Sequence, residues 1–318
     1  MFRQFITPLL LCIFSISFTL YSLKKDLFQD PLEPFLKKQK PFVTVKFRGE
    51  LGNQMFQVAA GLALALENKA EFILPKKNLT LKKEGASTNM KEVFFRLPVR
   101  KISRYQIRHK HHEEVFAPFS KIPFKPNLRL AGYYESEKHF RKYRNIIQKV
   151  FAPSEKTMAY LEKNYASILH HPKSVAIHVR TFYKDYLKDG ITFYEDFPAP
   201  TMEYFEKAMS LFDEDCLFVV FSDYIPWCKK NFSHLKHNLI FIENEPYYHD
   251  FYLMSRCKHV ITSPSSFSWW AAYLNPNPNK RVIARTPWAL EENRVNDDIF
   301  LEDWELIEVD PHPTPPKF

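Results

Sequence analysis

The second half of the chain alternates short β-type runs with segments of helical spacing. Apolar, mostly β-branched or aromatic runs occupy residues 175–179, 217–221, 239–242, 260–262 and 282–284. Between them, helical spacing is found over 202–212, around Trp227, across 251–254 and around Trp269 and Trp270. Strands that alternate with helices are typical of a parallel sheet with right-handed crossovers, and we predict this α/β arrangement here.

The region from residue 43 to about 171 is basic and less regular, but it opens with a clear unit. Residues 43–47 alternate like a strand, glycines at positions 49 and 52 predict a tight turn, and a helix is expected to begin near Asn53. The apolar face of that helix is formed by Met55, Ala59, Leu62 and Leu66.

Polar side chains follow four consecutive strands of the second half. These residues are Arg180, then Ser222 and Asp223, then Glu243 and Asn244, and finally Ser263, Ser265 and Ser266. Because the carboxyl ends of parallel strands meet at one edge of the sheet, we expect these residues to gather where open α/β sheets bind ligands.

Two elements at this edge suit a diphosphate. Arg180 carries a planar, permanently charged fork that matches phosphate oxygens, although a salt bridge to a nearby acid is the alternative role. Ser265 and Ser266 stand where the next helix begins, so their hydroxyls and the first-turn amides can hold an anion. Together these groups could bind a diphosphate without a metal ion.

Composition excludes several other kinds of site. The chain has 6 glycines, and only those at 49 and 52 lie close together, so a P-loop and a GxGxxG turn are absent. A GxSxG elbow is absent as well. Four cysteines without a CxxC pair predict neither a zinc framework nor a dense disulfide scaffold, and at least one of Cys216, Cys228 and Cys257 must be free or intermolecular.

The net charge of +9 comes without a nucleic-acid-binding module, so we expect no nucleic-acid partner and a basic face toward anionic lipid or donor.

Two motifs could suggest a metal, and both are interpreted as solvated surface. Asp213-Glu214-Asp215 has the DxD form but precedes a strand, at the edge opposite the polar cluster. The run HKHHEE at residues 109–114 lacks partner cysteines and contains a lysine that repels cations. We therefore expect no metal.

The amino terminus has the pattern of a membrane anchor. Residues 5–23 are uncharged and mostly apolar, which nearly matches the hydrocarbon core of a bilayer when helical, and no small-x-small cleavage site follows. We predict an anchor over 1–24 and a basic stem over 25–41. Basic residues on both flanks leave the orientation open.

Several segments resemble motifs of the α-1,2-fucosyltransferases of glycosyltransferase family eleven. Residues 49–59 (GELGNQMFQVA) resemble GxLGNQMFQYA, and residues 178–180 (HVR) resemble the start of HxRRGDY. Residues 218–223 (FVVFSD) with WC at 227–228 resemble FxVFSDD…WC, and residues 250–259 (DFYLMSRCKH) resemble DLYLMSxCKH. Residues 265–275 (SSFSWWAAYLN) resemble SSFSWWGAWLN, and DW at 303–304 resembles the closing DW. The resemblance extends from residue 43 to about 307.

This resemblance implies a GT-B-like fold of two Rossmann-like halves, each with a parallel sheet, separated by a cleft. Residues 42–172 would be the acceptor-side domain and 173–318 the GDP-fucose-binding domain. The implied activity is inverting, metal-independent transfer of L-fucose from GDP-fucose to the 2-hydroxyl of a terminal galactose on a glycan, with no cofactor. The membrane would be that of the Golgi for a eukaryotic source, with a lumenal catalytic domain, and the cell membrane for a bacterial one.

The resemblance also implies roles for particular residues. Arg180 would hold the β-phosphate, and Asp250 would contact guanine. Asn53 would lie at the sugar face of the cleft. The diphosphate pocket would be lined by Ser265, Ser266 and Phe267, and the remaining donor-site residues are His178, Ser222 and Asp223.

One departure from the family motif affects the proposed chemistry. Thr181 replaces the second arginine of HxRRGDY, and Phe182, Tyr183 and Lys184 follow in place of Gly-Asp-Tyr. A missing cation weakens stabilisation of the departing GDP, although Lys184 could substitute. A membrane-tethered carbohydrate-binding protein with weak or lost catalysis is therefore the alternative function. The general base stays open between Asp185, Glu50 and a donor phosphate oxygen, and Asp185 is favoured because it follows the same strand as Arg180.

Overall fold

The computed structural model describes residues 40–113, 117–183, 187, 199–290 and 297–310. Contacts divide the chain into two units, residues 1–40 and residues 41–318, and nearly all described residues belong to the second. The predicted anchor and most of the predicted stem lie outside the described residues. Within the described ranges, no helix has both the length and the apolar character needed to span a bilayer.

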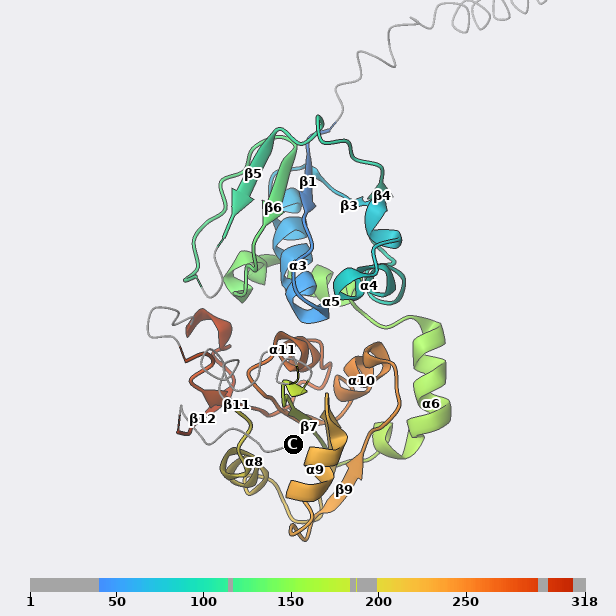
Figure 1. The fold of residues 1–318 in the computed structure, drawn as a ribbon, viewed down its shortest axis with the longest axis vertical. Helices are drawn as coiled ribbons and strands as arrows, with labels where there is room; N and C mark the ends of the chain where they lie inside the picture. The colour runs from blue at the N-terminus through green and yellow to red at the C-terminus, as the bar shows by residue number, and fades with distance from the viewer. Residues whose placement is uncertain (1–39, 114–116, 184–186, 188–198, 291–296, 311–318) are drawn as a thin grey trace, which may run out of the picture. The chain divides into compact units, whose positions relative to one another are not determined.

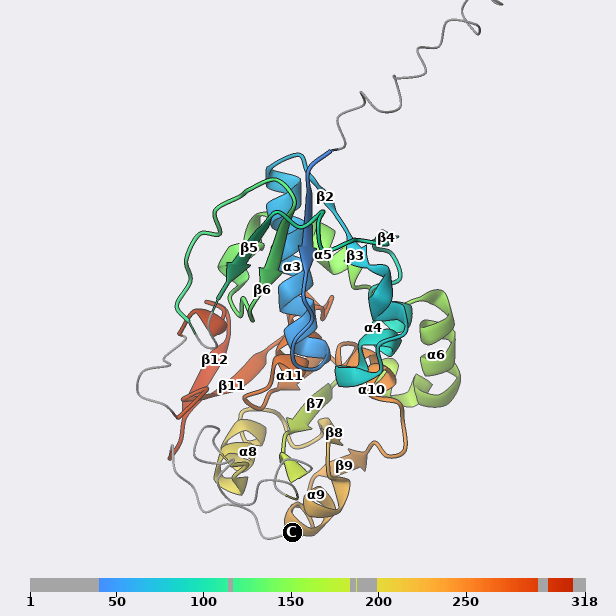
Figure 2. The ribbon, with the colours of Figure 1, turned by 45° about the horizontal axis from the view of Figure 1, so that its top comes forward.

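The first sheet has four strands in the order β2-β1-β6-β5, and all of its neighbouring pairs are parallel. Its strands are β1 (Phe42–Val45), β2 (Glu71–Phe72), β5 (His109–His112) and β6 (Leu128–Ala131). A two-stranded parallel sheet of β3 (Leu74–Pro75) and β4 (Val99–Arg100) accompanies it. Helix α3 (Leu51–Glu67) follows β1, as predicted, and lies along the first sheet in both views (Figures 1 and 2).

The second sheet has six strands in the order β12-β11-β10-β7-β8-β9, and its pairs are all parallel. The strands are β7 (Ser174–Val179), β8 (Leu217–Ser222), β9 (Asn238–Phe241), β10 (His259–Ile261), β11 (Val282–Thr286) and β12 (Glu305–Glu308). Five of these strands occupy the predicted runs, so the parallel α/β arrangement of this half is confirmed.

Helices and short 3-10 turns connect the strands. The remaining described helices are α4 (Ala86–Glu92), α5 (Arg144–Val150), α6 (Glu155–Leu169), α8 (Met202–Met209), α9 (Ile225–Asn231), α10 (Tyr247–Met254) and α11 (Ser266–Tyr273). The 3-10 turns are η1 (Lys76–Leu79), η2 (Lys83–Gly85), η3 (Glu137–His139), η4 (Arg141–Tyr143) and η6 (Asp297–Ile299).

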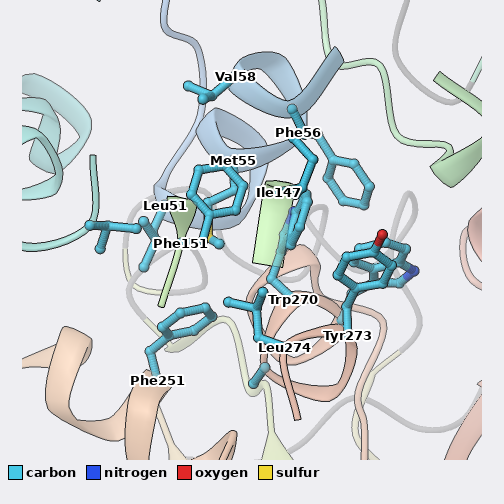
Figure 3. Close-up of a cluster of buried hydrophobic side chains, with 14 of the residues drawn as sticks. Leu51, Met55, Phe56, Val58, Ile147, Phe151, Phe251, Trp270, Tyr273 and Leu274 are labelled. Atoms are coloured by element: carbon cyan, nitrogen blue, oxygen red, sulfur yellow. The ribbon is translucent and has the colours of Figure 1, made fainter. Parts of the chain in front are cut away.

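One apolar core joins the two larger sheets. Alternate residues of the second sheet point to opposite faces. One face packs with α3, α10 and α11 in a cluster that also includes the first sheet, and the other face packs with α8 and α9. Aromatic rings fill the centre of the shared cluster (Figure 3): the centroids of Phe56 and Trp270 are 5.0 Å apart, and Phe140 stacks on Trp270 at 5.4 Å.

Helices α3 and α11 approach each other closely at their amino ends. A Cβ atom on Gly52 would stand only 2.4 Å from the backbone carbon of Ser266. Only a residue without a side chain fits between these two helices. The turn predicted from Gly49 and Gly52 therefore also brings the first sheet's helix to the start of α11.

Candidate functional site

Three predicted site segments meet at one edge of the second sheet. Strands β10, β7 and β8 are consecutive neighbours, so their carboxyl ends place Ser263, Arg180 and Asp223 side by side. The Ser263 hydroxyl donates to the carbonyl of His178 at 2.6 Å and accepts the amide of Arg180 at 3.1 Å. The predicted gathering of polar strand-end residues is therefore observed for these strands.

Asp223 organises the turn that follows β7. Its carboxylate accepts hydrogen bonds from Arg180 Nη1 at 3.0 Å and from the amide and hydroxyl of Thr181 at 2.7 and 3.0 Å. The amide of Tyr183 donates to the same carboxylate at 3.3 Å. The salt bridge considered as the alternative role of Arg180 is thus present, and the side chain of Arg180 still keeps 24% of its surface exposed. Its guanidinium remains able to contact a ligand while Asp223 fixes its direction.

The departure from HxRRGDY has a structural basis. Thr181 is fully buried and directed at Asp223, so this position contributes a hydrogen-bond donor rather than a second cation. Phe182 stands where the motif has glycine and adopts a positive φ of 54°, a region that favours glycine. Its buried ring lies 4.7 Å from the Arg180 guanidinium carbon, which gives a cation–π contact that glycine could not make.

Helix α11 begins at this edge with a capped first turn. Ser265 is its N-cap, and the Ser265 hydroxyl accepts the amide of Phe267 at 3.3 Å. Ser266 is the first helical residue, and Phe267 is half-buried with its ring 5.5 Å from that of His178. Because the first amides of a helix lack intrahelical acceptors, this turn retains donors for an anion.

His178 is a neutral histidine beneath this edge. The His178 side chain, which strand β7 carries, is buried, and its Nδ1 atom has no hydrogen-bond partner among the described residues. Burial lowers the pKa of His178 to about 3; the nearby Asp223 opposes the shift, and Arg180 adds to it. The ring therefore stays uncharged at neutral pH. Ser222 is engaged locally, since its hydroxyl accepts the amide of Tyr224 at 3.0 Å.

Asp250 lies on α10 with one unpartnered carboxyl oxygen. Its Oδ1 atom is buried and meets no donor among the described residues. Burial raises the pKa of Asp250 to about 8, and the nearby Glu245 adds to the rise. Glu245 itself accepts the hydroxyls of Tyr160 and Tyr165 at 2.8 and 2.7 Å. A buried carboxyl without a donor is a site that a ligand's N–H groups can satisfy.

Asn53 is paired with a carboxylate that the sequence did not single out. Its Nδ2 atom donates to Glu135 Oε1 at 2.8 Å, and Glu135 is buried just after β6. Burial raises the pKa of Glu135 to about 7; the Asn53 hydrogen bond lowers it and the nearby Glu113 raises it further. Asn53 belongs to α3 and Glu135 follows β6, so both are attached to the first sheet. Asn53 also directly follows Gly52, which packs against Ser266.

A series of hydrogen bonds that the sequence did not predict links the amino end of α3 to α10. Gln54 Nε2 donates to the carbonyl of Gly49 at 2.8 Å, and Asn89 Nδ2 donates to Gln54 Oε1 at 2.9 Å. The hydroxyl of Tyr247 then donates to Asn89 Oδ1 at 2.6 Å. These hydrogen bonds connect the turn after β1 with α10, the helix that carries Asp250.

The remaining candidates lie elsewhere. Asp185 and Lys184 fall outside the described residues, and Glu50 is exposed at the N-cap of α3. Asp213 and Asp215 both bind Lys173, at 2.8 and 2.9 Å, in the loop before β8. Residues 109–112 of the predicted surface run form β5, and within the described ranges no three His, Cys, Asp or Glu side chains group as metal ligands. The cysteines at 216, 228 and 257 are free and buried.

A cavity of about 340 Å³ lies away from this edge. It opens where α5, α10 and α11 end, and Lys149 and Arg256 are its charged lining residues. The predicted donor-site residues do not line it. Lys149 and Arg256 stand at the carboxyl ends of α5 and α10, where helices favour nearby cations.

Comparison with known proteins identifies the family. A sequence profile of glycosyl transferase family 11 matches residues 17–308. An alpha-1,2-colitosyltransferase of Escherichia coli is 28% identical over 84% of this chain and 99% of its own length. Galactoside alpha-(1,2)-fucosyltransferase 1 of Homo sapiens is 29% identical over 73% of this chain and 65% of its own length. The solved alpha-1,6-fucosyltransferase NodZ of Bradyrhizobium, soaked with GDP-fucose, shares the fold with a TM-score of 0.50 at 14% identity, over 78% of this chain and 96% of that one. The chain belongs to glycosyl transferase family 11, as its motifs suggested.

Proposed function

We propose that this protein transfers L-fucose from GDP-fucose to the 2-hydroxyl of a terminal galactose on a glycan. The observation that carries the proposal is the meeting of Arg180, fixed by Asp223, with the capped amino end of α11 at one sheet edge. A cation and a helix amino terminus together suit a diphosphate. Family membership and the alpha-1,2 linkage in the names of two relatives support the same activity.

In this proposal the donor lies along the carboxyl ends of the second sheet. Arg180 binds the β-phosphate, and Ser265, Ser266 and Phe267 contact the diphosphate. The guanine N–H groups donate to the carboxylate of Asp250. They thereby satisfy its buried Oδ1 atom, which otherwise meets no donor among the described residues. His178, Ser222 and Asp223 support the turns that present these groups.

The proposed reaction is an in-line displacement that inverts the anomeric carbon. The bond to GDP breaks ahead of bond formation, so negative charge develops on the β-phosphate. Arg180 and the first-turn amides of α11 are oriented to stabilise this charge, and no metal is invoked. Asp185, Glu50 and a donor phosphate oxygen are the candidate acceptors for the proton of the 2-hydroxyl, and Asp185 is our choice.

Replacement of Arg180 tests the proposal. Arg180→Ala should lower kcat by about a hundredfold or more while the protein stays folded, because it removes charge stabilisation from the transition state. Arg281→Ala is the matched control: Arg281 also pairs with a carboxylate, Glu305, at 2.7 Å, but it precedes β11 and lies at the opposite edge. Equal turnover in Arg180→Ala and wild type would contradict the assignment, and a loss of activity with a chelator would contradict the metal-independent mechanism.

Colitose is the second candidate for the transferred sugar. It is favoured by the relative named as an alpha-1,2-colitosyltransferase, whose whole length aligns with this chain. Colitose is L-fucose without its 3-hydroxyl group. Competition between the GDP-linked forms of the two sugars, with linkage analysis of the product, separates these donors. A carbohydrate-binding protein without catalysis would release no GDP from either donor above background.

We also propose that residues 1–24 anchor the chain in a membrane. The support is the uncharged apolar run over 5–23, flanked by Arg3 and by Lys24 and Lys25. The membrane would be that of the Golgi in a eukaryote and the cell membrane in a bacterium. Alkaline extraction should leave the full chain in the membrane fraction and release a variant that lacks residues 1–24.

A further inference from the structure

The side-chain amide of Asn53 lies between Glu135 and Gly49. On one side its Nδ2 atom donates to Glu135 Oε1 at 2.8 Å. On the other side lies Gly49, with a φ of +64°, where an added Cβ would stand 2.6 Å from Asn53 Oδ1. Glycine accepts this φ and leaves room for the amide. The hydrogen bond to Glu135 therefore orients the Asn53 amide, and the missing side chain of Gly49 leaves space for it.

Glu135 reaches Asn53 from a rigid segment. Its neighbour Tyr134 is buried, and the Tyr134 hydroxyl donates to the carbonyl of His111 at 3.1 Å. On the other side, the Ser136 amide donates to the carbonyl of Tyr134 at 2.9 Å, and the Ser136 hydroxyl accepts the amide of Lys138 at 3.2 Å. The carboxyl group of Glu135 is thus presented by fixed backbone, which is what precise placement of a functional side chain requires.

Asn53 lies beside the start of the donor site. The preceding residue, Gly52, touches the backbone of Ser266 at the amino end of α11. Asn53 is only half-buried, and its Oδ1 atom and second Nδ2 hydrogen are not used by Glu135. These two groups are able to contact a sugar next to the diphosphate.

We propose that Glu135 is a positioning residue for sugar transfer, which orients the amide of Asn53 toward the reacting sugar. The inference rests on the proposed function, in which Asn53 faces the sugar. The role needs an oxygen acceptor at position 135 and not a negative charge. A glutamine there can also accept the Asn53 hydrogen bond, whereas a leucine cannot.

Steady-state kinetics of substituted enzymes test this role. Glu135→Leu should lower kcat by about a hundredfold, because misplacement of a substrate-contacting group by about 1 Å has effects of that size. The affinity for GDP should stay unchanged. Glu135→Gln should restore kcat to within about threefold of wild type with an unshifted pH profile. In a double-mutant cycle, Glu135→Leu should add little to the loss caused by Asn53→Ala.

Glu113→Leu is the matched control. Glu113 is a buried carboxylate just after the neighbouring strand β5, and its Oε2 atom lies 3.3 Å from His139 Nε2. The Glu113→Leu variant should be less stable than wild type but should not show the hundredfold loss in kcat expected for Glu135→Leu. A Glu135→Leu enzyme with wild-type kcat would overturn the inference. So would a Glu135→Gln enzyme as slow as Glu135→Leu, because the carboxylate itself would then be required.

A second measurement does not depend on turnover. In wild type, the side-chain NH₂ resonance of Asn53 should shift as Glu135 titrates near pH 7, the region to which burial raises the pKa of Glu135. Glu135→Gln should fold and abolish that shift. A pH-dependent shift of the Asn53 resonance that persists in Glu135→Gln would overturn the inference, because a group other than Glu135 would then act on this amide. A wild-type protein that shows the shift but transfers no sugar would instead contradict the proposed function.

Discussion

At the scale of a single residue, the guanine contact proposed for Asp250 would couple its protonation to donor binding. Its pKa is raised to about 8 by burial and by Glu245, and Tyr165 also faces it, so the free protein holds this carboxyl largely protonated at pH 7. In the proposed contact the guanine N–H groups need the ionised carboxylate, so binding should release a proton. The affinity for GDP-fucose should rise about tenfold per pH unit well below pH 8 and level off above it.

Calorimetry in buffers of different ionisation enthalpy measures both the affinity and the released proton. GDP-fucose is the suitable ligand, because its diphosphate is doubly esterified and does not titrate in this range. Asp250→Asn should bind weakly and without this pH dependence. Wild-type affinity that is flat from pH 6 to 8 would exclude a guanine contact at Asp250.

His178, near the carboxyl end of β7, should make the stability of the protein depend on pH in the acid range. Its folded-state pKa of about 3 lies below the ordinary value of 6.5, so the unfolded chain binds more protons between these values. The stability that this group contributes is complete above pH 6.5 and is lost as the pH falls toward 3. Wild type should lose about 2 kcal/mol from this residue between pH 7.5 and 5.

Urea denaturation at both pH values checks this prediction. His178→Gln should be less stable than wild type at pH 7.5, but its free energy of unfolding should fall less on acidification. The same decline in both proteins would show that another group dominates the acid response.

At the scale of elements, sequence patterns predicted the second sheet better than the first. Strand β7 is buried along its whole length, so its apolar run is continuous and easily recognised. Strand β5 consists of His109–His112 and alternates half-buried with exposed residues, which gives it the polar character of a surface loop. Strands β2, β3 and β4 have two residues each, too few for a periodic pattern.

The same distinction applies to the site. Arg180 and Asp223 could be placed together because both follow strands of one parallel sheet. Glu135 could not be found in this way, because its partner Asn53 is 82 positions away and no local pattern reports such a pair. The bond between Tyr247 and Asn89 spans 158 positions and was missed for the same reason.

Gly52 tests the contact between α3 and α11. Gly52→Ala would place a Cβ 2.4 Å from backbone that cannot rotate away, so the two helices must separate. We expect a loss of about 3 kcal/mol in the free energy of unfolding and a lower kcat, because Asn53 moves with the helix. Gly61→Ala, in the same helix, is the control: its closest contact is a Phe72 ring atom at 2.6 Å, and alanine gains about 1 kcal/mol of helix propensity. Thermal unfolding and kcat of both variants check the prediction, and equal effects would contradict it.

At the scale of the whole molecule, the shared aromatic core predicts that the two larger sheets unfold together. The cluster around Trp270 contains residues of β1 and β6 as well as residues of β7, β8 and β10, so neither sheet keeps its core when the other opens. Trp270→Ala should lower the free energy of unfolding by about 4 kcal/mol. Hydrogen exchange should report the same loss for amides of β1 and of β8.

Phe232 provides the decisive comparison, because it lies in the cluster on the outer face of the second sheet and not in the shared core. If unfolding is cooperative, Phe232→Ala should also reduce the protection of β1, although no residue of β1 belongs to that cluster. Loss of protection in β8 alone would show two separately unfolding halves. In a cooperative molecule, damage at either sheet weakens the sheet edge that carries Arg180 and the Asn53–Glu135 pair to the same extent, because both depend on the core that α3 and α11 share.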